Sequence, residues 1–536
     1  MPAAPAHLEN KPLPRVDAAA LSTLAVALGG AALAAYATPW GLWGYSDSAA
    51  YIAAARNLAG GLGLTLPDAA GALHLSTLTP PFYTILLAPG AVPGLDPLDW
   101  ARALNLLLAF LFPAGLGLLG ARASGARWAG PLLALLAAAF PVLFTNAVSA
   151  MSEALFFCLG FGGLLLLAVP PERLSPRRLA LSAALVGLSA LTRYLGAAFI
   201  AAAVALVWLG APRRWARAAV YALGAALPLA LWLGCTMLAT GAFGARSLDA
   251  PPAALGGRWN EFFTQSLAIL STGLPFAGRG GALFPGPARL ALLFFLWAAA
   301  AGWGWSAAPA ALRRLLLAAA LFNLFYLLAL AAAFLFASIP PDLIPRIYSP
   351  LWPAVWLGLL AAAQAAILRL ERARASGAGR GWAQALRTGL ALVCAAQVLY
   401  FAPRLVELTA LGHAEGVGYT SRTWRDAPVF ERIQSELGER PLISDEPALI
   451  LLYTGRGAYP WEEWVRGNLR AAAHGSAPGQ GQGRLDELMR SGAALVLFPP
   501  RVEEEYGPES RDLLQRWTGG MYALYSAPEA EILLAP

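Results

Sequence analysis

Long apolar stretches with almost no charged residues recur between Leu21 and Phe401. A helix needs about 20 mainly apolar residues to cross the hydrocarbon core of a bilayer. Charged residues make up only 13% of the chain, against about a quarter in an ordinary soluble domain, which argues against a soluble enzyme. We therefore predict an α-helical polytopic membrane protein with about eleven spans, at residues 18–37, 101–121, 128–145, 150–169, 179–192, 195–210, 216–239, 288–306, 314–337, 350–369 and 385–403.

The fifth and sixth stretches are short, and only Arg193 and Tyr194 separate their ends. They predict either two spans joined by a tight hairpin or one broken helix, so residues 179–210 stay open in the count. The first stretch follows Lys11 and Arg15 and has no small-residue cleavage site after its apolar run. This pattern is typical of a retained anchor rather than of a cleaved signal peptide.

Arginines cluster in every second loop between the predicted spans. Short cytoplasmic loops carry an excess of Lys and Arg, and this bias sets the orientation of a membrane protein. The pattern predicts a plasma-membrane protein in which residues 1–17 are cytoplasmic and residues 404–536 are extracytoplasmic. The basic loops contain Arg122 and Arg127; Arg173, Arg177 and Arg178; Arg213, Arg214 and Arg217; Arg313 and Arg314; and five arginines from Arg369 to Arg387.

The net charge of +7 is divided unevenly along the chain. Residues 1–403 carry a net charge of +13, whereas residues 404–536 carry one of −6. The positive charge therefore belongs to the membrane domain, residues 18–403, and to its short N-terminal segment, where it reports topology. We expect no nucleic-acid partner, because the part of the chain outside the membrane is acidic.

Residues 404–536 predict a small α/β domain outside the membrane. Short apolar runs at Pro441–Ser444 and Ala493–Phe498 are strand candidates, and Ala448–Tyr453 is a candidate helix. Tyr522–Ser526 and Glu531–Leu534 resemble a hairpin, and Gly475–Gly483 has the composition of a flexible loop. All three cysteines lie in apolar runs of the membrane domain, so this domain is not a disulfide scaffold.

Two acidic residues are expected at the outer ends of early spans. Asp47 lies just after the first span, in the first outer loop (38–100), and precedes a short helical pattern at Ala49–Leu58 that fits the membrane surface. Glu153 lies at the outer end of the fourth span, where an ionisable side chain is costly and therefore a functional candidate. Each acid has a second explanation: Asp47 as a helix N-cap, and Glu153 as an acid favoured near a helix start.

Two arginine–tyrosine pairs are expected at the same depth, Arg193 with Tyr194 and Arg346 with Tyr348. Arginine suits phosphate because its guanidinium contacts two oxygens at once, but snorkelling to ordinary lipid headgroups would explain the same pattern. His74 has no second ligand at metal spacing, which favours a surface or packing role. In the long outer loop (240–288), Trp259–Leu270 predicts an amphipathic helix with Phe262, Phe263 and Leu267 on one side, either covering an outer cavity or resting on the bilayer.

These features together resemble the GT-C superfamily of membrane glycosyltransferases, over residues 15–403. The most similar members are the protein O-mannosyltransferases, the aminoarabinose transferases of lipid A and their bacterial relatives. Each motif alone is weak, whereas their order and their common side of the membrane carry the resemblance. The matching segments are Asp47 after the first span, Pro80-Pro81-Phe82-Tyr83, Met151-Ser152-Glu153, Leu191–Gly196, Arg346–Pro350 and, in the outer domain, Leu442–Pro447 with Tyr453–Arg456.

The resemblance implies an inverting transferase that uses a polyprenyl-phosphate-linked sugar as donor and a lipid, glycan or protein hydroxyl as acceptor. It implies Asp47 as the general base, and Arg193 and Arg346 beside the carrier phosphate. Glu153 would orient Asp47 or hold a sugar hydroxyl, and Tyr83, Tyr194, Tyr348 and His74 are further candidates for donor or substrate binding.

The first loop departs from many relatives, which have two adjacent acids there, whereas Ser46 and Ser48 flank Asp47. A divalent cation usually takes several oxygen ligands, so we expect no obligatory metal cofactor and only weak support for a divalent ion.

Two other functional classes fit a polytopic chain with an outer domain. A transporter or lipid flippase is expected to place polar or broken segments near the middle of the membrane, whereas the acids here gather at the outer ends. A non-catalytic receptor would work through residues 404–536 and would not depend on Asp47.

Overall fold

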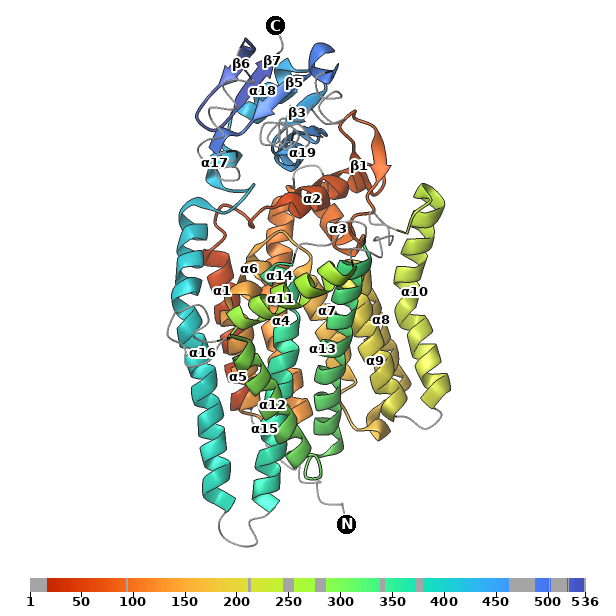
Figure 1. Cartoon of the computed structure of the whole chain (residues 1–536), viewed down its shortest axis with the longest axis vertical. Coiled ribbons are helices and arrows are strands. Elements are labelled where there is room, and N and C mark those ends of the chain that lie inside the picture. The colour runs from red at the N-terminus through yellow and green to blue at the C-terminus, as the bar shows by residue number, and fades with distance from the viewer. Residues whose placement is uncertain are drawn as a thin grey trace, which may run out of the picture.

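The computed structural model describes residues 17–92, 95–210, 214–243, 255–274, 286–337, 343–372, 379–461, 487–500, 502, 518 and 520–534. Long helices form an elongated bundle, and a small sheet domain lies beyond one end of it (Figure 1). We name this end of the bundle the outer end and the sheet domain the outer domain. The predicted loop Gly475–Gly483, like Lys11 and Arg15, lies outside the described residues.

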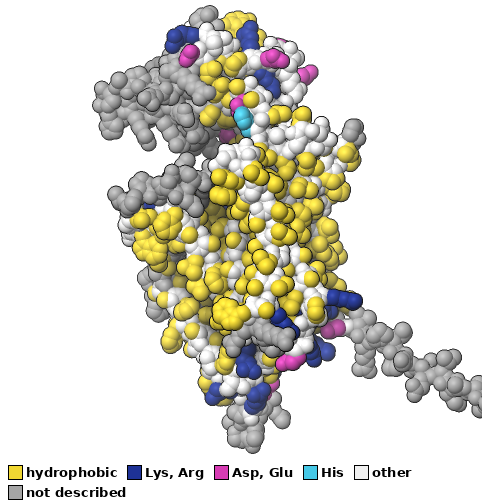
Figure 2. Space-filling view, turned by 90° about the vertical axis from the view of Figure 1, so that its right-hand side faces the viewer, with side chains coloured by type: hydrophobic (Ala, Val, Ile, Leu, Met, Phe, Trp, Pro, Cys, Tyr) yellow, Lys and Arg dark blue, Asp and Glu magenta, His cyan; other side chains and the backbone are white. Residues whose placement is uncertain are grey.

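Six helices in the described part of the chain are long and apolar enough to cross a membrane. Hydrophobic side chains cover the sides of the bundle, and Lys, Arg, Asp and Glu lie mainly towards the two ends (Figure 2). This surface fits a multi-pass membrane protein, as the sequence predicted. The six helices are α1 (Ala18–Tyr36), α4 (Pro97–Ser124), α10 (Arg214–Thr240), α13 (Ala310–Phe336), α15 (Leu351–Arg372) preceded by the short α14 (Pro345–Tyr348), and α16 (Gly379–Glu415).

The other predicted stretches are helical too, but none of these helices, over its described residues, is by itself both long and apolar enough to count as a span. α5 (Ala129–Ala139) and α6 (Pro141–Val148) are bent by 68°, because Phe140 is extended and Pro141 has no N–H to continue the helical ladder. Helices therefore occupy all eleven predicted stretches, whereas length and hydropathy identify six spans, or seven with the bent pair. The remaining helices are α7 (Glu153–Leu166), α8 (Pro176–Thr192), α9 (Ala197–Gly210) and α12 (Gly286–Gly304).

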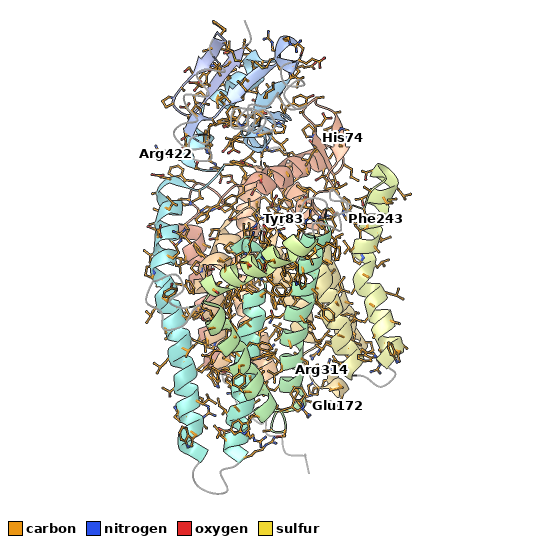
Figure 3. All side chains as sticks on the ribbon, viewed as in Figure 1. His74, Tyr83, Glu172, Phe243, Arg314 and Arg422 are labelled. Carbon is orange, nitrogen blue, oxygen red and sulfur yellow. The ribbon has the colours of Figure 1, made fainter. Side chains whose placement is uncertain are left out.

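Residues 176–210 form two helices, α8 and α9. A short 3₁₀ turn, η3 (Tyr194–Gly196), joins α8 to α9, and a Cβ at Gly196 would lie only 2.4 Å from the Ala190 Cα atom. The chain then returns to the end of the bundle opposite the outer domain. There a Cβ at Gly210 would lie 1.8 Å from the Arg314 guanidinium. Arg314 lies at the end of the bundle opposite His74 (Figure 3).

Glycines set how closely the bundle helices approach one another. A Cβ at Gly117 in α4 would lie 2.5 Å from the Gly130 carbonyl oxygen and 2.6 Å from the Thr23 side chain. A Cβ at Gly160 in α7 would lie 2.2 Å from the ring of Phe199 in α9. In lipid, helices associate through van der Waals fit rather than through burial from water, so these positions require the absence of a side chain.

The outer domain is built around a five-stranded sheet in the order β4-β3-β5-β7-β6. β3 is parallel to β4 and β5, whereas β7 pairs antiparallel with β5 and β6. The strands and the helix that the sequence predicted are all present. The elements are α17 (Arg422–Arg425), α18 (Val429–Glu436), β3 (Leu442–Ser444), α19 (Pro447–Thr454), β4 (Tyr459–Pro460), β5 (Ala494–Leu497), β6 (Tyr522–Ser526) and β7 (Glu531–Leu534).

Asp445 ties together the ends of two neighbouring strands in this sheet. It directly follows β3, and both of its carboxylate oxygens accept from the N–H of Phe498, which directly follows β5, at 3.1 and 3.3 Å. Burial raises the pKa of Asp445 to about 8. We therefore assign Asp445 a structural role.

The first outer loop folds between the bundle and the outer domain. The sequence predicted that its helix would lie on the membrane surface, but α2 is buried on both sides. Ala49, Tyr51 and Ile52 belong to one hydrophobic core with residues of the outer domain. The apolar side chains of α2 are therefore buried within the protein rather than in the bilayer. The loop contains α2 (Ser46–Ala59), β1 (Thr65–Pro67), β2 (Leu73–Leu75), α3 (Phe82–Leu87) and the 3₁₀ helix η1 (Ala88–Ala91).

The long outer loop contains α11 (Leu255–Thr272), which lies across the bundle (Figure 1). The sequence placed Phe262, Phe263 and Leu267 on one side of this helix. In the structure Phe262 is buried and its ring lies 5.8 Å from that of Phe334, whereas Phe263 and Leu267 are exposed. The helix therefore has one apolar side on the bundle and another that is suited to lipid.

Gly117 and Gly115 lie in the same helix and form a matched pair for testing the packing of α4. We expect Gly117→Ala to lower the thermal unfolding midpoint in detergent, because the added methyl group meets the backbone of Gly130. Gly115→Ala should leave the midpoint unchanged or raise it slightly, because a Cβ there has no atom within 4 Å. Equal midpoints for the two variants would contradict the observed approach of α4 to α5.

Candidate functional site

A backbone bridge joins the first and second outer loops. The Trp43 N–H donates to the Val148 carbonyl at 2.8 Å, and the Trp43 carbonyl accepts from the Ala150 N–H at 2.9 Å. The first loop reaches Asp47 four residues after Trp43, and the second reaches Glu153 three residues after Ala150. This short parallel pairing therefore brings together two acids that are far apart in the sequence.

Asp47 is the second residue of α2 and lies in its first turn. The sequence left open whether Asp47 caps this helix, and the structure gives the N-cap position to Tyr45, whose N–H donates to the Ser48 hydroxyl at 3.0 Å. Asp47 instead directs its Oδ2 atom at Arg346, whose Nη2 lies 3.1 Å away. Its side chain is 28% exposed, so it is partly accessible to solvent.

Glu153 is the first residue of α7, and only 3% of its side chain is exposed. Its Oε1 atom lies 2.8 Å from Arg193 Nη1 and 3.3 Å from Arg346 Nε. The positive end of a helix favours an acid at this position, but the two guanidinium groups are its direct partners. Within the described residues, neither oxygen of Glu153 accepts a hydrogen bond of good geometry, so the carboxylate keeps unused acceptor capacity.

The two acids and two arginines form one continuous chain of ion pairs, in the order Asp47, Arg346, Glu153, Arg193. We name these four residues the ion-pair cluster. Arg346 lies in α14 and contacts both acids, whereas Arg193 lies at the turn between α8 and α9. The sequence predicted all four as site residues, and the structure brings them into direct contact. Opposite charges make the burial of Glu153 tolerable.

Two further residues support the ion-pair cluster, and sequence reasoning missed both. The Ser152 hydroxyl accepts from Arg193 at 3.1 Å and lies 2.9 Å from the Tyr51 hydroxyl. Burial raises the pKa of Tyr51 to about 12, so this hydroxyl stays protonated. Tyr51 lies one helical turn after Asp47 on α2, and that i, i+4 spacing to a candidate acid was the available signal.

The other predicted residues lie apart from the ion-pair cluster or beneath the surface. Tyr83 and Tyr348 are completely buried, so their predicted role in binding substrate stays a prediction. Tyr83 donates to the Asn105 side chain at 3.2 Å, and Tyr348 lies 2.5 Å from the Ser266 hydroxyl.

Tyr194 and His74 are bound within the outer loops. The Tyr194 hydroxyl donates to the Thr77 carbonyl at 3.1 Å and accepts from Trp232 at 3.2 Å. His74 is exposed on β2 and pairs with Asp68 at 3.0 Å, and this hydrogen bond lowers the pKa of Asp68. Neither contact involves the ion-pair cluster, so a substrate-binding role for these two residues stays a prediction.

The side chains at the ion-pair cluster do not suit a divalent cation. Among the described residues, no group of three His, Cys, Asp or Glu side chains is placed to hold a metal ion. Asp47 and Glu153 are bridged by the Arg346 guanidinium. A cation between them would have to displace this arginine, so the arginines supply the positive charge here.

No protein-family model matches the chain, and no curated protein matches it in sequence. Solved structures are similar to it. The apo oligosaccharyltransferase of Archaeoglobus fulgidus aligns with a TM-score of 0.51 and 14% identity over 96% of this chain and 74% of that one. ArnT from Cupriavidus metallidurans, in the apo state, aligns with a TM-score of 0.48 and 16% identity over 96% and 97%. AglB from Archaeoglobus fulgidus, in complex with an inhibitory peptide and a dolichol-phosphate, aligns with a TM-score of 0.48 and 13% identity over 96% and 74%.

The likeness to the apo oligosaccharyltransferase shows a common fold. The predicted fold class, a polytopic α-helical membrane protein with a small α/β domain after its last helix, is therefore confirmed.

Removing one arginine from the ion-pair cluster should expose the cost of burying Glu153. We expect Arg193→Ala to destabilise the protein by up to about 3 kcal/mol, because a nearly buried carboxylate loses one of its two cations. Arg177→Ala, at an exposed position of α8, should have little effect. Adding Glu153→Gln to Arg193→Ala should restore part of the lost thermal stability in detergent, and no recovery would contradict the buried-charge explanation.

Proposed function

We propose that this protein is an inverting membrane glycosyltransferase that moves a sugar from a polyprenyl-phosphate carrier to a hydroxyl acceptor. The observation that carries this proposal is the ion-pair cluster at the outer end of the bundle, in which the partly exposed Asp47 pairs with Arg346 and the buried Glu153 pairs with Arg346 and Arg193. A carboxylate that can accept a proton and cations that can hold a phosphate are the two requirements of this reaction. The shared GT-C fold is compatible with it.

In the proposed reaction Asp47 is the general base. It accepts the proton of the acceptor hydroxyl while the acceptor oxygen forms a bond to the anomeric carbon of the sugar. The bond from that carbon to the phosphate oxygen breaks at the same time, and its electron pair leaves with the lipid phosphate. The acceptor attacks from the side opposite the phosphate, which inverts the anomeric configuration. Asp47 Oδ2 faces Arg346, and among the described residues no hydrogen bond or ion pair engages Oδ1.

Arg346 and Arg193 are the proposed phosphate ligands. A guanidinium carries five N–H donors, so the contacts of Arg346 with the two acids leave further donors for phosphate oxygens. The side chains of Arg346 and Arg193 are 29% and 22% exposed, which allows a donor to approach them. Both oxygens of Glu153 are buried, so its proposed role is to orient Asp47 through Arg346, which contacts both acids.

The polyprenyl donor, the acceptor side and the cellular orientation belong to the same proposal. The arginines of the predicted inner loops, such as those that follow Glu172, belong to the end of the bundle opposite the outer domain (Figure 3). With that end in the cytoplasm of a plasma-membrane protein, the ion-pair cluster would act on the extracytoplasmic side. A lipid, a glycan or a protein hydroxyl would suit Asp47 equally well as acceptor.

Asp47→Asn tests the assignment of the base. We expect transfer of a labelled sugar from polyprenyl phosphate to fall by about 100-fold or more, because an amide cannot take the acceptor proton. Asp99→Asn changes an exposed acid in the first outer loop and should keep wild-type activity. Release of polyprenyl phosphate and transfer of sugar would be measured together in detergent. Undiminished transfer by Asp47→Asn would exclude this residue as the base.

Chelation tests the electrostatic assignment independently. We expect transfer to continue at the wild-type rate after treatment with EDTA, because Arg346 occupies the place between Asp47 and Glu153. Arg346→Gln should abolish transfer and should not be rescued by added magnesium or manganese. Loss of activity in EDTA that returns on addition of either ion would contradict the assignment of positive charge to the arginines.

A further inference from the structure

A short segment that leads into the outer domain, residues 417–420, lies directly on the segment that leads to Asp47. We name residues 417–420 the strap. The Gly44 N–H donates to the Val417 carbonyl at 3.2 Å, and the Gly44 carbonyl accepts from the Tyr419 N–H at 2.9 Å. Gly44 and Gly418 thereby form a parallel bridge. Together with the bridge between Trp43 and Ser149, this contact makes residues 42–44 the middle of three neighbouring backbone segments.

The approach of the strap is too close for side chains. Gly418 has a φ of +69°, and a Cβ there would lie 2.0 Å from the Gly44 carbonyl oxygen. A Cβ at Gly44 would lie 2.9 Å from the Thr420 methyl group, and the Thr420 hydroxyl donates to the Leu42 carbonyl. Nearby, the Arg422 guanidinium lies 5.4 Å from the centre of the Trp40 ring. The strap therefore fixes the backbone immediately before α2.

A second contact fixes the other end of α2. The Arg56 side chain, in the last turn of α2, donates to the Leu452 carbonyl at 2.5 Å. Leu452 lies in the last turn of α19, where carbonyl groups have no partner within the helix and a cation is favoured. Burial lowers the pKa of Arg56, and nearby Asp96 opposes this shift. The Arg56 guanidinium therefore binds the outer domain rather than solvent.

We propose that the outer domain is a working part of the active site, and that Arg56 and Gly418 are positioning residues for Asp47. Both act through α2, which carries Asp47 in its first turn and Arg56 in its last. On the opposite side, Tyr51 ties α2 to Ser152 beside Glu153. The helix is therefore held between the bundle and the outer domain, and the position of Asp47 relative to Arg346 depends on both attachments. This inference rests on the function proposed above.

Arg56→Ala tests the attachment at α19. We expect kcat for sugar transfer to fall by about 10- to 100-fold, because a small displacement of a reacting group has a large effect on rate, while KM for the lipid donor stays near wild type. Arg56→Lys should recover part of kcat, since an ammonium can still donate to the Leu452 carbonyl. Arg404→Ala removes an exposed arginine of α16 that pairs with Glu407 and should leave kcat unchanged.

Gly418→Ala tests the strap, with Gly438→Ala as its matched control. Both glycines have a positive φ, but a Cβ at Gly438 has no atom within 4 Å. We expect Gly418→Ala to lower kcat and Gly438→Ala to have little effect on it. Hydrogen exchange of the amides of α2, followed by mass spectrometry, gives a readout that does not need activity. It should become faster in Arg56→Ala and Gly418→Ala while exchange in α13 stays unchanged.

The outcomes separate this inference from the proposed function. Inactive Asp47→Asn together with fully active Arg56→Ala and Gly418→Ala, and unchanged exchange in α2, would overturn the positioning role and leave the function standing. If the wild type transferred no sugar from any polyprenyl-phosphate donor tested, the function would fail, and faster exchange in the two variants would still support the attachment of α2. A general loss of folding is recognised by a lowered thermal midpoint and by faster exchange in α13.

Discussion

The outer half of the structure depends on the ion pairs of Glu153, whose carboxylate is almost completely buried. A charge in this position is tolerated only with cations in direct contact, and its two cations come from distant parts of the chain. Arg193 is delivered by the turn between α8 and α9, and Arg346 by α14. Satisfying one carboxylate therefore fixes the relative positions of three loops, and Asp47 is added to them through Arg346.

The backbone bridges explain why this arrangement extends to the outer domain. Residues 42–44 pair with residues 148–150 on one side and with residues 417–419 on the other. The first of these pairings sets the distance between the two acids. The second links the same segment to the sheet domain, so that a shift of the outer domain would be transmitted to α2 through the backbone rather than through flexible side chains.

The sequence predicted the helices, the outer-domain strands and the four residues of the ion-pair cluster, because each has a local signal. Apolar length identifies spans. An acid or arginine at the end of a span stands out because placing an ionisable group near the hydrocarbon core costs free energy. The same logic failed for α2, whose mixed composition resembles an interfacial helix, because its covering layer comes from residues about 400 positions later. The burial of Tyr83 and Tyr348 could not be predicted for a related reason, because an aromatic beside a motif has the same sequence pattern whether it lines a cavity or fills a core.

The charge balance of the ion-pair cluster bears on how the proposed reaction could proceed. Two acids and two arginines make the resting cluster neutral. As the bond to the sugar breaks, the carrier phosphate gains one negative charge, and Asp47 loses one by taking the acceptor proton. The total charge of the site therefore stays constant through the step. The attraction of Arg346 for Asp47 weakens as its attraction for phosphate grows, so the same guanidinium can serve the base before the reaction and the leaving group during it.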